Sequence, residues 1–557
     1  MKYDLCIVGS GAGAGPIAYE LTRAGYKVLI LEKGGLYQKE DFFKDEIGVC
    51  RRPSFTPRLD EEQHVIEELE GENWVATPTS QSGWDFWNGN IVGGSSNFMS
   101  GYFHRMKPQD FQLRTRYGDI EGANIVDWPI SYADLEPYYA KTEEVVGISG
   151  RVSQHPFQEP RSTKDFPFTP THEHVISSWF DRACEKKGLF SIPTPRAVLP
   201  YAVEERQGCE YAGYCGSYGC SSGAKGSARE ALLNKALNTG LLEIRPHSFV
   251  KKFHSDKQKV LSAEYIDEKG LVHQVSASVF VLAAQAIESS RLLLNSANQY
   301  FPHGLANNSN QVGKNMIFSA GGSGSGEFHY QDLDKKESLA LKEVGPFVNR
   351  SLQDWYELTD KQSTQKGGTI DFLFEHPNAV SRAKRAMYDG DIVWGDTLKD
   401  RLLKHFKARR VFNFEIFCDW TPTDDCFVSL DEEVKDKWGM PVAKLRIASH
   451  PQDIKIGEKI ALEAESLLKE MGARSVSSHI SSLPPQNLQA GGCRFGDDPQ
   501  KSVLNKDCRT HELTNLYVSD GSFMPTGGSV PFTWTIYANS FRVADVIIKE
   551  LTQRKDT

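Results

Sequence analysis

Three of the chain's ten cysteines lie within one short segment, GCEYAGYCGSYGCSSGAKGS, which begins at Gly208. Cys209, Cys215 and Cys220 are separated by five and then by four residues. Three thiolates on a glycine-rich loop are able to converge on one face of an iron–sulfur cluster, because glycines let backbone N–H groups turn towards the sulfides. Zinc is a weaker interpretation, since the segment has no CxxC pair and no histidine. A disulfide would leave one thiol over, and the remaining alternative is a loop with free thiols.

The glycines near the N-terminus indicate a different chemistry, the binding of a dinucleotide. Gly9 permits a tight turn, Gly11 lets the backbone approach a pyrophosphate, and the small Ala14 lets a helix pack closely on a strand. The phosphates would lie at the positive end of that helix. Glu32 is placed to accept hydrogen bonds from a ribose 2′-hydroxyl. This pattern predicts a dinucleotide site but does not distinguish FAD from NAD.

The elements that must position these residues follow from the same stretch. A short apolar strand is expected at 3–8, a helix over PIAYELTRAG, and a second strand over KVLILE, which ends at Glu32. A strand, a glycine turn, a helix and a second strand form the unit in which a dinucleotide lies across the carboxyl ends of parallel strands. The acid and the glycines are therefore expected at the same edge of one sheet.

Composition limits the classes of function. At 557 residues the chain is expected to form two or three domains, and 39% hydrophobic with 25% charged residues is typical of a globular protein. A net charge of −9 argues against a nucleic-acid partner. No window approaches the roughly 20 apolar residues of a membrane helix. The N-terminal segment has no signal-peptide pattern, so we expect cytoplasmic synthesis and folding, with export open if a partner subunit carries the signal.

Two more loops extend the pattern and together define a resemblance. The first is GNIVGGSSN at 89–97, and the second follows a strand that ends at Asp520 and precedes a closing helix. Each alone would be an ordinary surface loop. With the N-terminal glycines, and with VFVLAAQAIESSRLLLNSA from Val279 and NQVGKNM from Asn310, they resemble the glucose–methanol–choline (GMC) flavin oxidoreductases. Within that family, DWPISYADLEPYY from Asp127 is most similar to the flavoprotein subunits of sugar and gluconate dehydrogenases.

The resemblance implies a fold of two parts. One is an α/β, Rossmann-like FAD-binding domain of the GMC type, expected at 1–110, 205–325 and 485–557. The other is an α+β substrate-binding domain built on an antiparallel sheet, expected at 111–204 and 326–484. The two-residue alternation in VFNFEIFCDW and AKLRIASH is typical of such strands.

The resemblance also implies which residues hold FAD. They would bind its ADP half, its pyrophosphate and its ring, and they are Gly9, Gly11, Ala14, Glu32, Gly93, Gly94, Ser95, Asn97, Val250, Asp520 and Gly521. Some relatives bind the flavin covalently through a histidine in the second glycine loop. Phe98 stands at that place here, so we expect FAD to be held non-covalently.

For the cysteine segment, the resemblance implies an iron–sulfur cluster that carries electrons from the flavin to a haem partner. Three ligands suit a [3Fe–4S] cluster, or a [4Fe–4S] cluster with an unusual fourth ligand. Ala212 stands where some related sequences have a further cysteine. A loop with free thiols that packs over the flavin stays open as the alternative.

The catalytic residues of the family are missing from their usual places. Leu488 stands where a general-base histidine is expected, and Val530 stands where a histidine or asparagine would hold the substrate hydroxyl. His479 is the candidate base in their stead, with Asn487 and Gln489 as its hydrogen-bonding neighbours.

The expected function is an FAD-dependent dehydrogenase that oxidises a hydroxyl of a sugar, sugar acid or glycoside. Its electrons would pass to a cytochrome-type acceptor, with a small companion subunit. The alternatives are an alcohol oxidase that uses oxygen, and a flavoprotein that has lost alcohol oxidation and serves in electron transfer or as a scaffold.

Overall fold

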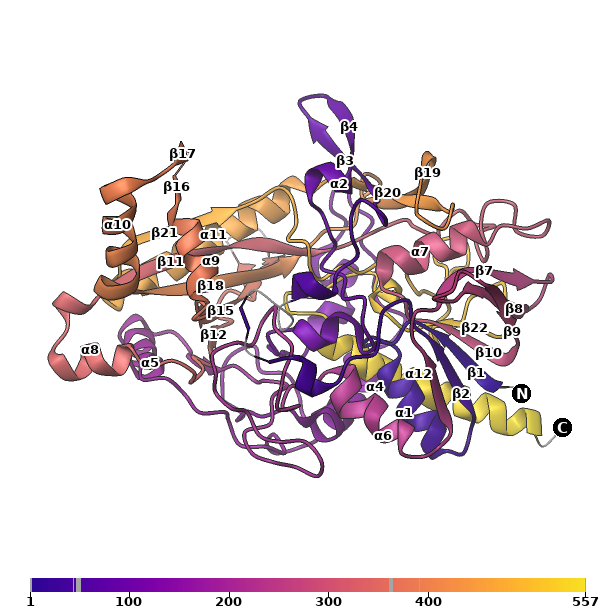
Figure 1. Cartoon of the computed structure of the whole chain (residues 1–557), viewed down its shortest axis with the longest axis horizontal. Coiled ribbons are helices and arrows are strands. Elements are labelled where there is room, and N and C mark those ends of the chain that lie inside the picture. The colour runs from indigo at the N-terminus through magenta and orange to yellow at the C-terminus, as the bar shows by residue number, and fades with distance from the viewer. Residues whose placement is uncertain (1–2, 44, 47–51, 360–363, 390, 556–557) are drawn as a thin grey trace.

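The computed structural model describes residues 3–43, 45–46, 52–359, 364–389 and 391–555 (Figure 1). A five-stranded parallel sheet forms one half of the molecule, in the strand order β22–β10–β1–β2–β6. These strands are β1 (Tyr3–Val8), β2 (Val28–Leu31), β6 (Leu242–Arg245), β10 (Ala277–Leu282) and β22 (Leu516–Val518). The four residues of β2 are all buried, as expected for strands that are covered on both faces.

Helices cover this sheet and place its glycine loop. Helix α1 (Gly15–Arg23) begins directly after the N-terminal glycines and packs against α12 (Thr533–Lys555), which in turn contacts α4 (Tyr132–Thr142). Figure 1 shows α1, α4 and α12 on the same side of the sheet. Helix α7 (Ala286–Asn295) follows β10 and packs on β7 (Phe249–Ser255), which forms an antiparallel sheet with β8 (Val260–Ile266) and β9 (Val272–Val275).

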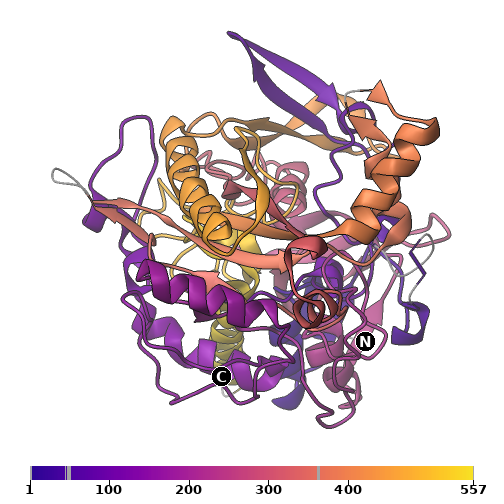
Figure 2. The ribbon, with the colours of Figure 1, turned by 90° about the vertical axis from the view of Figure 1, so that its left-hand side faces the viewer.

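A six-stranded sheet forms the other half, in the order β21–β11–β18–β15–β12–β5, and all its pairs are antiparallel. Its strands are β5 (Ile192–Pro193), β11 (Ser319–His329), β12 (Arg350–Leu352), β15 (Gly368–Phe374), β18 (Arg409–Asp419) and β21 (Arg474–Ile480). Helix α11 (Pro451–Glu470) packs along β11, β21, β18 and β15, as Figure 2 shows. The structure thus has the expected α/β half and the expected antiparallel half.

The elements cross the domain boundaries expected from sequence. Strands β3 (Val65–Glu70) and β4 (Asn73–Pro78) form one sheet with β19 (Phe427–Lys435) and β20 (Pro441–Ile447), and β3 pairs with β20 in parallel. Helix α4 lies in the expected substrate part but packs on the FAD half. Backbone hydrogen bonds between distant segments, which local patterns do not reveal, join the two parts.

The remaining helices and strands are short or peripheral. They are α2 (Thr79–Ser82), α3 (Leu113–Tyr117), α5 (Ile176–Lys187), α6 (Asn234–Leu237), α8 (Lys335–Leu341), α9 (Ala379–Ala386), α10 (Gly395–Leu403), β13 (Glu357–Thr359), β14 (Thr364–Lys366), β16 (Tyr388–Asp389) and β17 (Asp391–Ile392). Within the described ranges, none of the helices has the length and apolar character needed to span a bilayer.

Candidate active site

The first glycine loop has the shape that close backbone packing requires. Gly9 has a φ of +91°, and a Cβ there would lie 2.3 Å from the carbonyl oxygen of Ala283. A Cβ on Gly13 would lie 2.7 Å from the carbonyl oxygen of Ser519. Gly11 differs, because no described atom lies within 4 Å of the position that its Cβ would take. A side chain at Gly11 would therefore point into open space, where a cofactor backbone is expected to approach.

Glu32 joins the two glycine loops. The hydroxyl of Ser10 donates to Glu32 Oε2 at 2.5 Å, and the backbone N–H of Gly34 donates to Oε1 at 2.8 Å. The N–H of Gly93 in turn donates to Ser10 Oγ at 2.9 Å. Burial raises the pKa of Glu32, and the hydrogen bond from Ser10 opposes this rise. The acid expected at the end of β2 thus lies buried beside both loops.

The second glycine loop lies directly against the first. Gly94 has a φ of +57°, and a Cβ there would be 3.1 Å from Gly11 Cα. The amide of Asn97 donates to the carbonyl oxygens of Val92 and Gly94, at 3.1 and 2.9 Å. Ser95 Oγ accepts from the N–H of Gly89 at 3.0 Å. Asn97 therefore fixes the shape of this loop.

Asp520 closes the same region from the C-terminal side. Its carboxylate accepts hydrogen bonds from the N–H of Gln285 at 3.1 Å, from the N–H of Ser522 at 2.9 Å, and from the hydroxyl of Ser289. Gln285, with a φ of +82°, caps α7 by accepting from the N–H of Ile287 at 2.9 Å. Asp520 thus links β22, α7 and the C-terminal loop around one opening.

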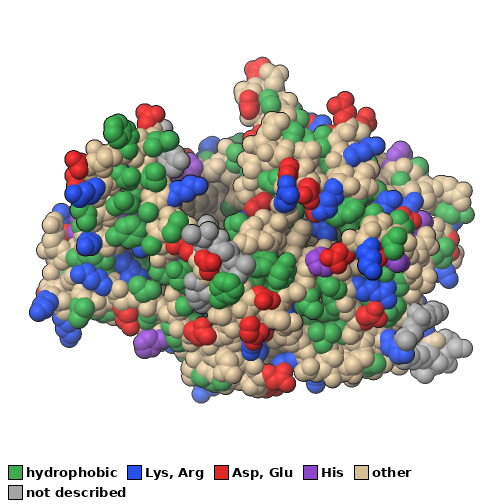
Figure 3. Space-filling model, in the orientation of Figure 1, with side chains coloured by type: hydrophobic (Ala, Val, Ile, Leu, Met, Phe, Trp, Pro, Cys, Tyr) green, Lys and Arg blue, Asp and Glu red, His purple; other side chains and the backbone are tan. Residues whose placement is uncertain are grey.

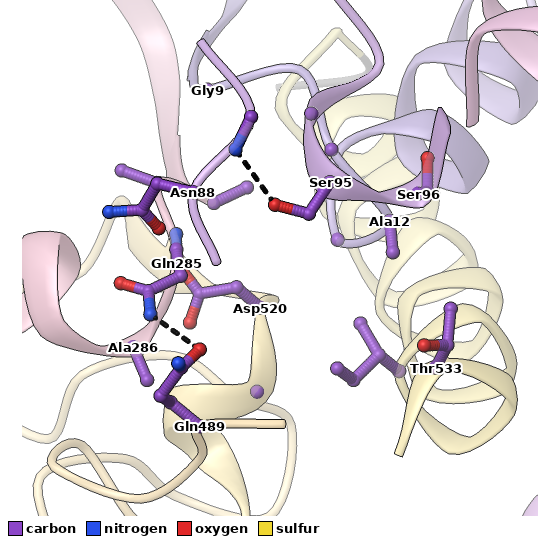
Figure 4. Close-up of a pocket in the computed structure, with 18 of the residues that line it drawn as sticks. Gly9, Ala12, Asn88, Ser95, Ser96, Gln285, Ala286, Gln489, Asp520 and Thr533 are labelled. Carbon is purple, nitrogen blue, oxygen red and sulfur yellow. Dashed lines mark hydrogen bonds between the residues drawn. The ribbon is translucent and has the colours of Figure 1, made fainter. Parts of the chain in front are cut away.

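These segments line one inner cavity, seen in part in Figure 4. Among the residues expected from sequence, those that line it are Gly9, Gly11, Glu32, Gly94, Ser95, Val250, Asp520, Gly521, Asn487, Leu488 and Gln489. Ala14, Gly93 and Asn97 lie behind the wall and support the loops. The cavity reaches from β2 to Glu415 and Phe417 on β18, so it spans both halves of the molecule.

Of the two residues at the family's catalytic positions, one lines the inner cavity and the other does not. Leu488 lines the cavity with a φ of +58°, whereas Val530 is fully buried and does not line it. Gln489 is already engaged, since its amide donates to Phe86 O at 3.0 Å and its oxygen accepts from Gln285 at 2.9 Å (Figure 4). Asn487 is the available amide, because its buried Oδ1 has no hydrogen-bond partner among the described residues.

His479 lies away from this cavity. It is exposed on β21, the edge strand of the antiparallel sheet, where it pairs with Ser323 of β11. The segment 481–486 does not fold back to carry it inwards, because β21 is held in register along β11. The expectation that His479 acts as the base is therefore corrected.

The cysteine segment forms a wall of turns and not a ligand set. Among the described residues, no three His, Cys, Asp or Glu side chains gather as metal ligands would. Cys215 donates to Ser100 O at 3.5 Å, whereas Cys209 Sγ accepts from the N–H of Tyr211 at 3.4 Å. Burial raises the pKa of the Cys209 thiol to about 12. The described geometry therefore does not support the expected iron–sulfur cluster at these three cysteines, and it shows the segment as a packed loop.

A buried lysine holds this loop in place. Lys225 Nζ donates to the carbonyl oxygens of Asn97, Cys215 and Tyr218, at 3.1, 2.8 and 2.7 Å. One ammonium group therefore joins the cysteine segment to the second glycine loop.

A second cavity, of about 520 Å³, adjoins the inner one, and we call it the vestibule. It shares Trp87, Ser100, Tyr102, Glu415 and Asn487 with the inner cavity. Its other polar lining residues include Arg196, Lys342, Glu375, His376, Arg382, Arg409 and Arg410. Figure 3 shows a recess on the face of the molecule beside α9, which carries Arg382.

Glu415 is a site residue that sequence reasoning missed. It lines both the inner cavity and the vestibule, and burial raises its pKa to about 7. The signal was present in VFNFEIFCDW, where Glu415 stands in the middle of a run of mostly aromatic and aliphatic residues. An ionisable side chain inside such a strand is costly unless it has a role.

Comparison with known proteins identifies the arrangement. Two family models described as GMC oxidoreductase match residues 70–318 and 422–540. The chain is 28% identical to 2-methyl-1,2-propanediol dehydrogenase of Mycolicibacterium austroafricanum, over 99% of this chain and 96% of that protein. It is 26% identical to the fructose dehydrogenase large subunit of Gluconobacter japonicus, over 99% of each chain.

A solved structure has the same fold. Pyridoxine 4-oxidase from Mesorbium loti superposes with a TM-score of 0.61 and 18% identity, covering 98% of this chain and 99% of that one. The two matched models together account for more than half of the chain, and they include the glycine loop at 89–97 and the loop after Asp520. The chain therefore belongs to the GMC oxidoreductase family, whose members are FAD-dependent enzymes that act on CH–OH groups.

Proposed function

We propose that the chain is a dehydrogenase that oxidises a hydroxyl group of a sugar, a sugar acid or a related polyol, and that passes the electrons to a separate acceptor. The observation that carries this proposal is the continuity of the inner cavity with a polar vestibule. One end has the loops that suit a dinucleotide, and the other offers arginine, lysine, amide and carboxylate groups. Such groups suit a small, polyhydroxylated or anionic substrate.

The chain's own residues fit FAD held without a covalent bond. Open space over Gly11 leaves room for the pyrophosphate, and the N-terminus of α1 and the buried Glu32 suit its ADP half. Phe98 is fully buried against Phe42 and Phe55, and no histidine is among the described residues that line the inner cavity. When bound there, FAD would supply the acceptor for a hydride from the carbinol carbon. The protein must orient that carbon and accept the hydroxyl proton.

The proposed acceptor is a cytochrome-type partner. Two relatives named as dehydrogenases, one of them a large subunit, support this part of the proposal. An iron–sulfur cluster is left out of the proposal, because the described residues form no group of three His, Cys, Asp or Glu side chains that could hold a metal. A companion subunit, and a location in the cytoplasm or in the periplasm with such a subunit, stay predictions.

Anaerobic reduction of the flavin tests the substrate class. The purified holoprotein is mixed with sugars, sugar acids and small diols, and the loss of the oxidised-flavin absorbance is followed in a stopped-flow instrument. We expect at least one polyol to bleach the flavin within seconds. The reduced protein is then mixed with oxygen, a quinone or cytochrome c.

The second mixing decides between the two acceptor classes. Fast reoxidation by quinone or cytochrome with slow reaction with oxygen supports a dehydrogenase. Fast formation of hydrogen peroxide would make the chain an oxidase. If no hydroxyl compound reduced the flavin, the electron-transfer or scaffold alternative would replace the proposal.

A further inference from the structure

Alcohol oxidation requires a group that accepts the hydroxyl proton, because a neutral alcohol is a poor hydride donor. The described lining of the inner cavity contains no histidine, and neither Leu488 nor Val530 accepts a proton. The ionisable side chains that do line it are few. Glu32, Asp520 and Glu288 belong to the dinucleotide end, where each is hydrogen-bonded to the protein. Glu415 is the carboxylate at the other end.

The strand that carries Glu415 points it at the cavities. In β18, Phe412, Phe414 and Ile416 are buried, and Gly324 of β11 leaves room for the ring of Phe414. Glu415 and Phe417 alternate with these residues, so they lie on the opposite face. Glu415 lines the inner cavity, the vestibule and a third cavity that is also lined by His376 and Lys384. One carboxylate therefore lies where all three meet.

The neighbours of Glu415 leave its carboxylate unengaged. Asp371 stands opposite Glu415 in the register of β15, but it is bound to His104 Nε2 at 3.0 Å. Arg196 is directed elsewhere, donating to Ser100 O at 3.1 Å and to Asn349. No hydrogen bond to the Glu415 carboxylate is found among the described residues, and Ser323, its partner on β11, is neutral.

We propose that Glu415 is the catalytic base that takes the proton from the substrate hydroxyl, and that Asn487 holds a neighbouring hydroxyl of the polyol. This inference rests on the proposed function. The O–H bond breaks and its proton passes to the carboxylate of Glu415. FAD, held by the glycine loops, would supply the acceptor for the hydride and its two electrons from the C–H bond, so that the carbinol would become a carbonyl. The proton then leaves Glu415 for water in the vestibule.

The charges around Glu415 suit this role at neutral pH. Burial, the larger cause, and the charge of Asp371 together raise its pKa to about 7, against the opposing effect of Arg196. Tyr102 and His104 are titratable groups on the segment at 102–104, and Glu375, His376 and Lys384 line the third cavity together with Glu415. A base whose pKa lies near the working pH accepts a proton readily and releases it again. Flavin reduction is therefore expected to rise with pH through about 7.

The test replaces Glu415 with glutamine in the holoenzyme. Glu415→Gln should keep its FAD, slow anaerobic flavin reduction by about a hundredfold or more, and abolish the rise with pH. The matched control is Asp419→Asn, on the same strand, because burial also raises the pKa of Asp419 to about 7, while Asp419 lines a separate cavity with Asp453. Asp419→Asn and His479→Ala should keep both the rate and the pH profile. A Glu415→Gln rate within about threefold of wild type would overturn the proposal.

A titration without substrate separates this inference from the proposed function. Infrared spectra of the holoprotein with carboxyl-labelled glutamate should show one carbonyl band that is lost as pH rises through about 7, and that is absent in Glu415→Gln. Glutamate labelling excludes Asp419 and Asp453. If no polyol reduces the wild-type flavin, the proposed function fails, and this titration alone then tests the inference about Glu415. An ordinary carboxyl pKa for Glu415 would contradict the inference that Glu415 is the catalytic base.

Discussion

Single residues in this protein are constrained by what a side chain would meet. Gly9 and Gly13 tolerate no Cβ because backbone carbonyls lie under 3 Å away, whereas Gly11 faces open space. The three glycines look alike in the sequence, but two of them serve the fold and one serves the cofactor. Gly11 is therefore the position at which cofactor binding is separable from folding.

Gly11→Val is expected to fold and to lose FAD. Its φ lies outside the left-handed region and no described atom obstructs its Cβ, so the substitution causes little strain, but the isopropyl group occupies the space that the pyrophosphate needs. Flavin absorbance per protein should fall at least tenfold, with the far-UV circular dichroism unchanged. Ala24→Val, at the exposed C-cap of the same helix, is the control and should keep its flavin. Full occupancy in Gly11→Val would show that the pyrophosphate lies elsewhere.

At the scale of elements, the cysteine segment is a wall of the vestibule. Cys215, Gly213 and Gly216 line the vestibule, and Lys225 ties the segment to the second glycine loop. Close packing of this loop explains why glycines are needed there, and no metal has to be assumed. A Cβ at Gly216 would lie 2.5 Å from Ser100 Oγ, and one at Gly219 would lie 2.2 Å from the ring of Phe42.

Anaerobically purified protein is expected to contain FAD and less than one iron per ten chains. The physical reason is that the three thiols have separate partners and that burial keeps Cys209 protonated. Iron is measured by plasma mass spectrometry beside flavin absorbance. Cys215→Ser should then leave the visible spectrum unchanged. If the wild-type protein contained stoichiometric iron and Cys215→Ser lost it, the iron–sulfur cluster hypothesis would be supported instead.

Lys225→Met is expected to loosen the cysteine segment. Methionine keeps the length of the side chain but leaves three buried carbonyl oxygens without their charged donor, which costs about 2–5 kcal/mol. The variant should unfold at a lower temperature, and Cys215 should react faster with a thiol reagent. Lys235→Met is the control, because the ion pair of Lys235 with Glu204 is largely exposed and contributes little. Equal effects of the two substitutions on melting temperature and thiol reactivity would show that Lys225 does not hold the cysteine segment in place.

At the scale of the whole molecule, the junction of the two halves contains carboxyl groups that prefer to be protonated. Burial raises the pKa of Glu415, Asp419 and Asp453 to about 7 in each case. In the unfolded chain such groups titrate near 4. The stability that they contribute is fully present below about pH 4 and is lost as the pH rises through about 7.

Asp419→Asn should therefore stabilise the protein at alkaline pH and not at acid pH. The amide has a similar shape and no charge to desolvate, and Lys366, 3.9 Å away, keeps its ion pair with Asp110. Melting temperatures of variant and wild type should differ by several degrees at pH 8, and the difference should vanish near pH 4. Comparing variant with wild type cancels the other groups, such as Glu159, whose pKa Lys107 lowers to about 2 against the effect of burial. A melting-temperature difference that is independent of pH would contradict the raised pKa of Asp419.

By itself, the sequence determined the features that local patterns encode. The strand, glycine turn and helix around Gly9 depend on residues that are close together, so their spacing predicted both the parallel sheet and the dinucleotide loop. The absence of the family's usual polar residues at Leu488 and Val530 could also be read from the sequence, because it depends only on which residue stands at each position. The tertiary structure decided what depends on distant segments meeting: the exposure of His479 on an edge strand, the packing of the cysteine segment around Lys225, and the pairing of β3 with β20. It also decided the place of Glu415, because burial and three adjoining cavities, not its neighbours in the chain, set the chemistry of that carboxylate.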